Sequence, residues 1–104
     1  MARVMAIYRT PKDAAAFDKY YFESHVPLAK TLPGLKKYEV SQGTIATPAG
    51  ESGIHRIAVL HFEDLRAVQA ALASAEGQAT AADVGMFAPE PGDVQILIFD
   101  TRQV

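Results

Sequence analysis

The chain has 104 residues, with 10 basic and 12 acidic side chains, a formal net charge of -2 and a sequence pI of about 5.8. This length predicts a single domain over residues 1–104, and 49 % apolar with 21 % charged residues is typical of a globular protein. The slightly acidic balance argues against nucleic-acid binding. The absence of cysteine excludes a disulfide framework and a thiol nucleophile. Without a membrane-length apolar run or a signal-peptide pattern, we expect a cytoplasmic protein with no membrane partner.

The N-terminal part of the chain predicts a strand followed by a helix. Residues 3–9 form a short apolar run that is typical of a strand. Thr10 suits the N-cap of a helix, and Pro11 suits its first position. We expect this helix to end or kink near His25, because Pro27 disfavours the helical conformation in the residue before it.

The rest of the chain predicts three more strands and two more helices. Alternating or continuous apolar runs mark the strands. Apolar residues at helical spacing mark the helix at 63–75, and Ser74 as an N-cap marks the one that follows it. We expect strands at residues 35–43, 54–62 and 93–100, helices at 63–75 and 75–84, and a long hairpin loop at 44–53.

The order β-α-β-β-α-β within about 100 residues indicates an α+β fold, a ferredoxin-like sandwich with a four-stranded antiparallel sheet and helices on one face. The strand at 54–62 is apolar on both faces, with Ile57 and Val59 on one and Ala58 and Leu60 on the other. Such strands are normally buried on both faces, and the helices suffice for only one. We therefore expect a homodimer that packs sheet to sheet into an α/β barrel. The alternative is a monomer with a modestly apolar outer face.

A pattern of aromatic, histidine and proline residues runs through most of the chain. It consists of Tyr8-x-x-Pro11, Tyr20-Tyr21-x-x-x-His25-x-Pro27-Leu28, Leu32-Pro33-Gly34-Leu35, Glu76-Gly77 and Ala82-Asp83. The pattern resembles the EthD family of dimeric α/β-barrel proteins, named for an ethyl tert-butyl ether degradation system. Its wider relatives include lactone isomerases, cofactor-independent monooxygenases, polyketide cyclases and dehydratases. The resemblance implies the fold and the dimer expected above, a role in catabolism, and a pocket between the sheet and the helices.

His25 is the candidate catalytic residue. The unperturbed pKa of imidazole lies near neutrality, so this side chain can accept and return a proton as a general acid/base. Lactone rearrangement, dehydration and proton abstraction beside a carbonyl all need such a group. The alternative is a histidine that stabilises a helix C-terminus. The resemblance at this position favours a role in the pocket.

Three tyrosines are candidates for substrate binding: Tyr8, Tyr21 and Tyr38. Each offers an apolar ring and a hydroxyl, which suit an aromatic or oxygenated ligand. Packing in the core, with the hydroxyl at a rim, explains each of them at least as well.

His61 and Asp83 are further candidates for the substrate site. His61 shares a strand face with His55 and points either into a pocket or into the dimer interface. Asp83 matches a family position and could pair with a histidine and orient it. The alternative, a solvent-exposed residue at a helix end, is the interpretation that we favour for Asp83 at this stage.

No cofactor signal is present in the sequence. The three histidines show no metal-ligand spacing, and no glycine-rich nucleotide loop occurs, so we expect neither a metal nor an organic cofactor. Haem-binding relatives in the superfamily leave a haem-ligating histidine as the alternative.

The sequence therefore predicts a small metabolic protein that acts on a cyclic or aromatic oxygenated metabolite, with His25 transferring a proton in an isomerase-, cyclase- or dehydratase-type reaction. One alternative is a non-catalytic accessory or carrier dimer that serves an oxygenase system. Another is a cofactor-independent monooxygenase.

Overall fold

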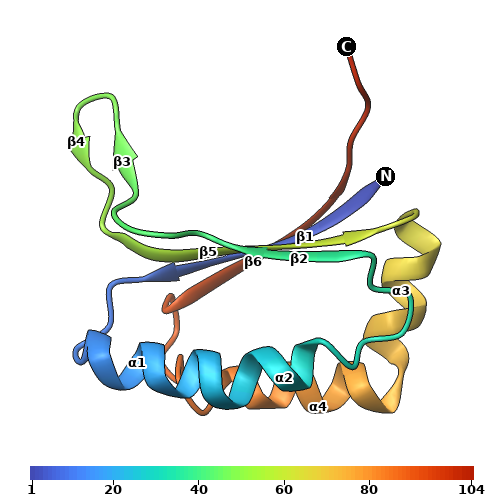
Figure 1. The fold of residues 1–104 in the computed structure, drawn as a ribbon, viewed down its shortest axis with the longest axis horizontal. Coiled ribbons are helices and arrows are strands. Elements are labelled where there is room, and N and C mark those ends of the chain that lie inside the picture. The colour runs from blue at the N-terminus through green and yellow to red at the C-terminus, as the bar shows by residue number, and fades with distance from the viewer.

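The computed structural model describes residues 1–104 and shows a four-stranded antiparallel sheet with the helices on one face (Figure 1). The strands run in the order β2-β5-β1-β6 and comprise β1 (Ala2–Arg9), β2 (Lys37–Val40), β5 (Ile54–Phe62) and β6 (Val94–Asp100). This arrangement confirms the ferredoxin-like α+β fold expected from the sequence. None of the helices has the length and apolar character that crossing a bilayer requires.

β2 is shorter than the strand expected at 35–43, because only its central residues pair with β5. The expected loop at 44–53 contains a small hairpin of its own, in which β3 (Ala46–Thr47) pairs with β4 (Gly50–Glu51). This hairpin projects from the end of the sheet, away from the helices (Figure 1).

The first helix, α1 (Ala14–Tyr20), begins later than the sequence predicted. Its N-cap is Asp13, whose carboxylate accepts a 3.0 Å hydrogen bond from the amide of Ala16. The prediction of Thr10 as the cap is wrong, because its hydroxyl instead donates to the carbonyl of Gly53 at 3.1 Å. The extra residues form a connection between the strand and the helix.

The sequence predicted an end or a kink of this helix near His25, and the structure shows an interruption of the regular α-helix there, not its end. A single π-turn, η1 (Tyr21–His25), continues α1 into α2 (Val26–Ala29), and the amide of Val26 donates to the carbonyl of Tyr21, five residues back. A proline inside a regular α-helix lacks an amide donor and its ring crowds the carbonyl four residues earlier. The wider π-turn immediately before Pro27 relieves this conflict.

The second helical pair lies against the same face of the sheet and consists of α3 (Leu65–Ala73) and α4 (Ala75–Val84). The carboxylate of Asp64 caps α3 by accepting from an amide at 2.8 Å, and the hydroxyl of Ser74 caps α4 at 3.0 Å. Both helices lie within two residues of their predicted bounds.

Strand register determines which sheet face meets the helices. Val4 on β1 pairs with Leu60 on β5, Ala6 pairs with Ala58, and all four are buried beneath the helices. Tyr8, on the same face of β1, is 2 % exposed. The apolar side chains that alternate with these residues point away from every helix, and they are Met5, Ile7, Ile57, Val59, Leu97 and Phe99. We refer to this second surface as the open sheet face.

Candidate functional site

A cavity of about 90 Å³ lies between the sheet and the helices. Of the 17 residues that line it, 14 are hydrophobic, and they come from all four strands of the main sheet and from η1, α2, α3 and α4. His25, Tyr8, Tyr21 and Tyr38 supply its titratable groups. The structure therefore brings four of the six residues predicted from the sequence to one cavity.

His25 projects from the π-turn and is 4 % exposed. Its Nδ1 lies 2.9 Å from Oδ2 of Asp83, and its ring packs at 4.7 Å from the ring of Phe87, measured between centroids. The Nε2 atom has no hydrogen-bond partner in the protein. Nε2 is also not fully enclosed. Since His25 lines the cavity and its Nδ1 is turned toward Asp83, which does not line it, Nε2 is the ring nitrogen left for a molecule in the cavity.

Asp83, on α4, lies behind His25 and does not line the cavity. Its Oδ1 accepts a 2.6 Å hydrogen bond from the hydroxyl of Tyr20, while Oδ2 faces His25. Burial alone would raise the pKa of Asp83, but the hydrogen bonds from Tyr20 and His25 hold it below its ordinary value. The interpretation of Asp83 as a solvent-exposed residue at a helix end is therefore wrong, because both of its carboxylate oxygens are hydrogen-bonded and its side chain is only 15 % exposed.

Burial lowers the pKa of His25 from its ordinary value of 6.5, and the nearby carboxylate of Asp83 opposes this shift without cancelling it. At neutral pH the imidazole is accordingly neutral. Because ionised Asp83 can only accept, the single ring proton of His25 resides on Nδ1. The lone pair on Nε2 is then free to act as a base toward the cavity.

The tyrosine hydroxyls line the same space. The hydroxyls of Tyr21 and Tyr38 lie 2.7 Å apart and share one hydrogen bond, which leaves one of their two protons free to donate. The hydroxyl of Tyr8 has no partner in the protein and is not fully enclosed. Burial raises the pKa of all three tyrosines, so they remain neutral hydrogen-bond donors.

His61 lies outside this cavity. It points to the open sheet face, where its Nε2 contacts Oε1 of Glu39 at 2.6 Å, and this hydrogen bond lowers the pKa of Glu39. Of the two positions that the sequence allowed for His61, the structure excludes the pocket of its own chain, because the sheet separates it from His25.

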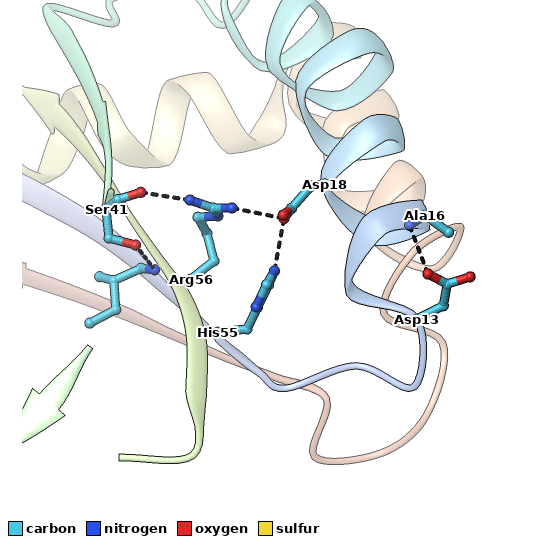
Figure 2. A network of polar contacts seen from close by, with 7 residues as sticks. Asp13, Ala16, Asp18, Ser41, His55 and Arg56 are labelled. Atoms are coloured by element: carbon cyan, nitrogen blue, oxygen red, sulfur yellow. Dashed lines mark hydrogen bonds and ion pairs between the residues drawn. The ribbon is translucent and has the colours of Figure 1, made fainter. Parts of the chain in front are cut away.

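A second, larger recess of about 430 Å³ lies beside the β3–β4 hairpin and is lined mainly by polar residues. At its edge, Oδ1 of Asp18 accepts hydrogen bonds from His55 at 2.8 Å and from Arg56 at 2.7 Å (Figure 2). Arg56 also donates to the carbonyl of Ser41 at 2.7 Å. These contacts join α1 to β5, so the network acts first as a structural link, although Nε of Arg56 has no partner. No three histidine or acidic side chains in the chain are close enough together to hold a metal ion.

Tyr20 is the residue of the site that the sequence prediction missed. Tyr20 and His25 are five residues apart, and regular helical spacing places such residues on different sides of a helix. The π-turn removes this separation, and the sequence signal that could have revealed it is Pro27 within an otherwise helical segment. Recognising that signal requires the helix to continue past the proline, which the usual rule disfavours.

Fold and cavity together define a ferredoxin-like α+β protein with an aromatic, histidine-bearing cavity between its sheet and its helices. The EthD domain matches residues 9–90, and the chain belongs to the EthD family. This confirms the resemblance seen in the sequence.

Individual relatives are similar over the whole chain. An uncharacterized 11.0 kDa protein from the thcB-thcC intergenic region of Rhodococcus erythropolis is 36% identical over 104 residues, which are 100% of this chain and 98% of that protein. An EthD family protein from Bacillus halodurans C-125 has a crystal structure with a TM-score of 0.89 and 30% identity, over 98% of this chain and 99% of that chain. A dimeric ferredoxin-like protein of unknown function from Thermobifida fusca YX gives a TM-score of 0.67 at 18% identity, over 96% and 90% of the two chains.

Proposed function

We propose that the protein acts on a small, uncharged, cyclic oxygenated metabolite bound in the cavity, and that His25 transfers a proton to and from it. The observation that carries this proposal is the hydrogen bonding of the two ring nitrogens of His25. Its Nδ1 is hydrogen-bonded to Asp83 while its Nε2 is unpartnered at the cavity. A general base must present a free lone pair within reach of the reacting proton, and this arrangement supplies one.

The lining of the cavity argues for an uncharged ligand. No lysine or arginine lines it, and its titratable groups, His25 and the three tyrosines, are neutral at neutral pH. An ionised carboxylate or ammonium group would lose its hydration there without gaining a partner, which costs several kcal/mol. The cavity volume of about 90 Å³ favours a compound with a single ring over a multi-ring one.

The proton transfer follows from the positions of the polar groups. A carbonyl oxygen of the ligand accepts a hydrogen bond from a tyrosine hydroxyl, either that of Tyr8 or the free proton of the Tyr21–Tyr38 pair. His25 Nε2 removes a proton from the carbon beside that carbonyl, and the electron pair of the broken C–H bond moves onto the oxygen as an enolate. The resulting imidazolium is stabilised by Asp83 and returns the proton to another atom of the ligand.

The second candidate is a non-catalytic carrier for a hydrophobic intermediate. The observation that favours it is the apolar character of the lining, whose only titratable groups are His25 and the three tyrosines. A carrier binds the same class of ligand but does not exchange its protons. A cofactor-independent monooxygenase differs from both in consuming oxygen during turnover.

Hydrogen–deuterium exchange distinguishes these candidates without knowledge of the full reaction. Purified protein is incubated in D₂O with single-ring lactones and cyclic ketones, and exchange at the carbon beside the carbonyl is followed by NMR. We expect exchange that falls by about 100-fold or more in His25→Gln, the usual range for general acid/base catalysis. Binding without exchange supports the carrier, and undiminished exchange in His25→Gln contradicts the assignment of His25.

We further propose that the protein is a homodimer in which two open sheet faces pack together. The face carries six apolar side chains and is covered by no helix of its own chain. Leu97 is exposed and the other five are half-buried in the single chain. A contiguous apolar surface that no element of its own chain covers is typical of protein interfaces. The similar fold from Thermobifida fusca is described as dimeric, which agrees with this proposal.

A further inference from the structure

The π-turn between α1 and α2 places two side chains on one carboxylate. Tyr20 donates to Oδ1 of Asp83 at 2.6 Å, and His25 Nδ1 lies 2.9 Å from Oδ2. In a regular α-helix, residues five apart point in directions about 140° apart around the axis, so they could not both face a residue on α4. A π-turn has its hydrogen bond between residues five apart, and it brings the two side chains to the same side of the helix.

Both oxygens of Asp83 are therefore engaged, one by each residue of the pair. A carboxylate held at both oxygens cannot rotate without losing one of its hydrogen bonds. The hydroxyl of Tyr20 remains a donor, because the hydrogen bond to Asp83 raises its pKa. The ring of Tyr20 is itself held against Phe87 at 5.8 Å between centroids, and Phe87 also packs on His25.

We propose that Tyr20 is a positioning residue that acts through Asp83 to fix the ring orientation and tautomer of His25. Its catalytic consequence rests on the proposed role of His25, but the tautomer itself is a property of the protein without substrate. Tyr20 does not line the cavity, so it does not contact the ligand. Removal of its hydroxyl leaves Asp83 free to turn and His25 free to exchange between tautomers.

The test is ¹⁵N NMR of histidine-labelled protein, above the pH at which His25 is protonated. In the wild type we expect a protonated Nδ1 and an unprotonated Nε2, with clearly separate shifts. In Tyr20→Phe we expect the two shifts to move toward each other and the Nδ1 proton to exchange faster with water. Tyr38→Phe is the matched control, because it removes a buried hydroxyl that has no contact with Asp83, and we expect the wild-type tautomer there.

An unchanged tautomer and exchange rate in folded Tyr20→Phe would overturn the proposal, and so would an equal change in Tyr38→Phe. If a substrate is found by the exchange assay, Tyr20→Phe should lower kcat about tenfold and leave KM unchanged, as expected for the loss of an outer-shell partner. A tautomer that responds to Tyr20→Phe while His25→Gln keeps full activity would leave Tyr20 as a positioning residue and refute the proposed function instead. The two proposals therefore fail separately.

Discussion

Arg56 and Asp18 form a link between the buried side of the sheet and the first helix, with Nη2 of Arg56 at 2.7 Å from Oδ1 of Asp18 (Figure 2). Arg56 is 8 % exposed, and its Nε atom has no partner, so this carboxylate is the main compensation for a buried positive charge. Loss of the Asp18 carboxylate should lower the stability of the folded protein, since removing one partner of a buried pair leaves the other charge uncompensated.

Asp18→Asn is therefore expected to lower the free energy of unfolding by about 1–3 kcal/mol, less than for a fully buried pair because Asp18 is partly exposed. Urea denaturation measures this loss. Asp13→Asn is the matched control on the same helix, since it removes the same charge while asparagine caps a helix about as well as aspartate. Equal losses in the two variants would contradict the importance of the Arg56 link.

Stability should depend on pH through His25. Its pKa in the folded protein is lower than the ordinary value of 6.5, because burial disfavours the charged ring. As the pH falls below 6.5, the unfolded chain therefore binds this proton before the folded protein does, and stability is lost until the folded pKa is reached. Above 6.5 the contribution of the neutral ring is complete. His25→Gln should flatten this part of the curve of urea midpoint against pH, whereas parallel curves would refute the lowered pKa.

Gly77, near the start of α4, has no room for a side chain. A Cβ atom there would lie 2.1 Å from the carbonyl oxygen of Ala71 and 2.7 Å from that of Leu72. Gly77→Ala should therefore destabilise the protein by about 1–3 kcal/mol, despite the better helix propensity of alanine. Thermal unfolding measures the effect as a fall in Tm of about 4 °C or more.

Gly85, at the other end of α4, provides the comparison. It has a negative φ, and a Cβ atom there would meet its nearest neighbour at 3.5 Å, an ordinary contact. Gly85→Ala should leave Tm nearly unchanged. A similar fall in Tm for both variants would contradict the close packing at Gly77, because it would show that an added methyl group destabilises α4 equally at either end.

The proposed dimer is tested by two neighbouring residues of β6. Leu97 points to the open sheet face and Ile98 to the helix face, and both are exposed in the single chain, at 39 % and 49 %. Leu97→Arg places a charge in the proposed interface, so we expect light scattering to show a monomer. Ile98→Arg adds the same charge on the opposite face and should remain dimeric. A wild-type monomer, or dissociation by Ile98→Arg alone, would contradict the sheet-to-sheet arrangement.

Local sequence signals were sufficient for the order of the four main strands and the helices between them, and for the family. The continuous apolar run of β5 and the apolar stripe of α3 predict a strand and a helix directly. The sequence could not show which face of β5 meets the helices, because both faces are apolar, and the decision depends on how well each face packs against helices distant in the chain. It therefore left the positions of Tyr8, Tyr38 and His61 open.

The candidate site was predictable only in part, for a similar reason. His25 was identified by its chemistry and by the family pattern, but its partner on α4 is 58 residues away in sequence. The sequence favoured a solvent-exposed position for Asp83, since it does not show which residues of other elements pack against the end of a helix. Tyr20 was missed because the π-turn depends on the conflict between Pro27 and the preceding carbonyls, which becomes visible only when the helix is seen to continue.

The central claim is that the cavity binds an uncharged ligand in contact with His25. Its most direct test is thermal unfolding of the wild type and His25→Ala with uncharged single-ring lactones, ketones and phenols. A ligand at 100 times its Kd should stabilise the wild type by about 2.7 kcal/mol, which raises Tm by several degrees. We predict that at least one such compound does so, that its carboxylate-bearing analogue does not, and that the shift is smaller in His25→Ala. Equal shifts in the wild type and His25→Ala, or a shift with the charged analogues alone, would contradict the account.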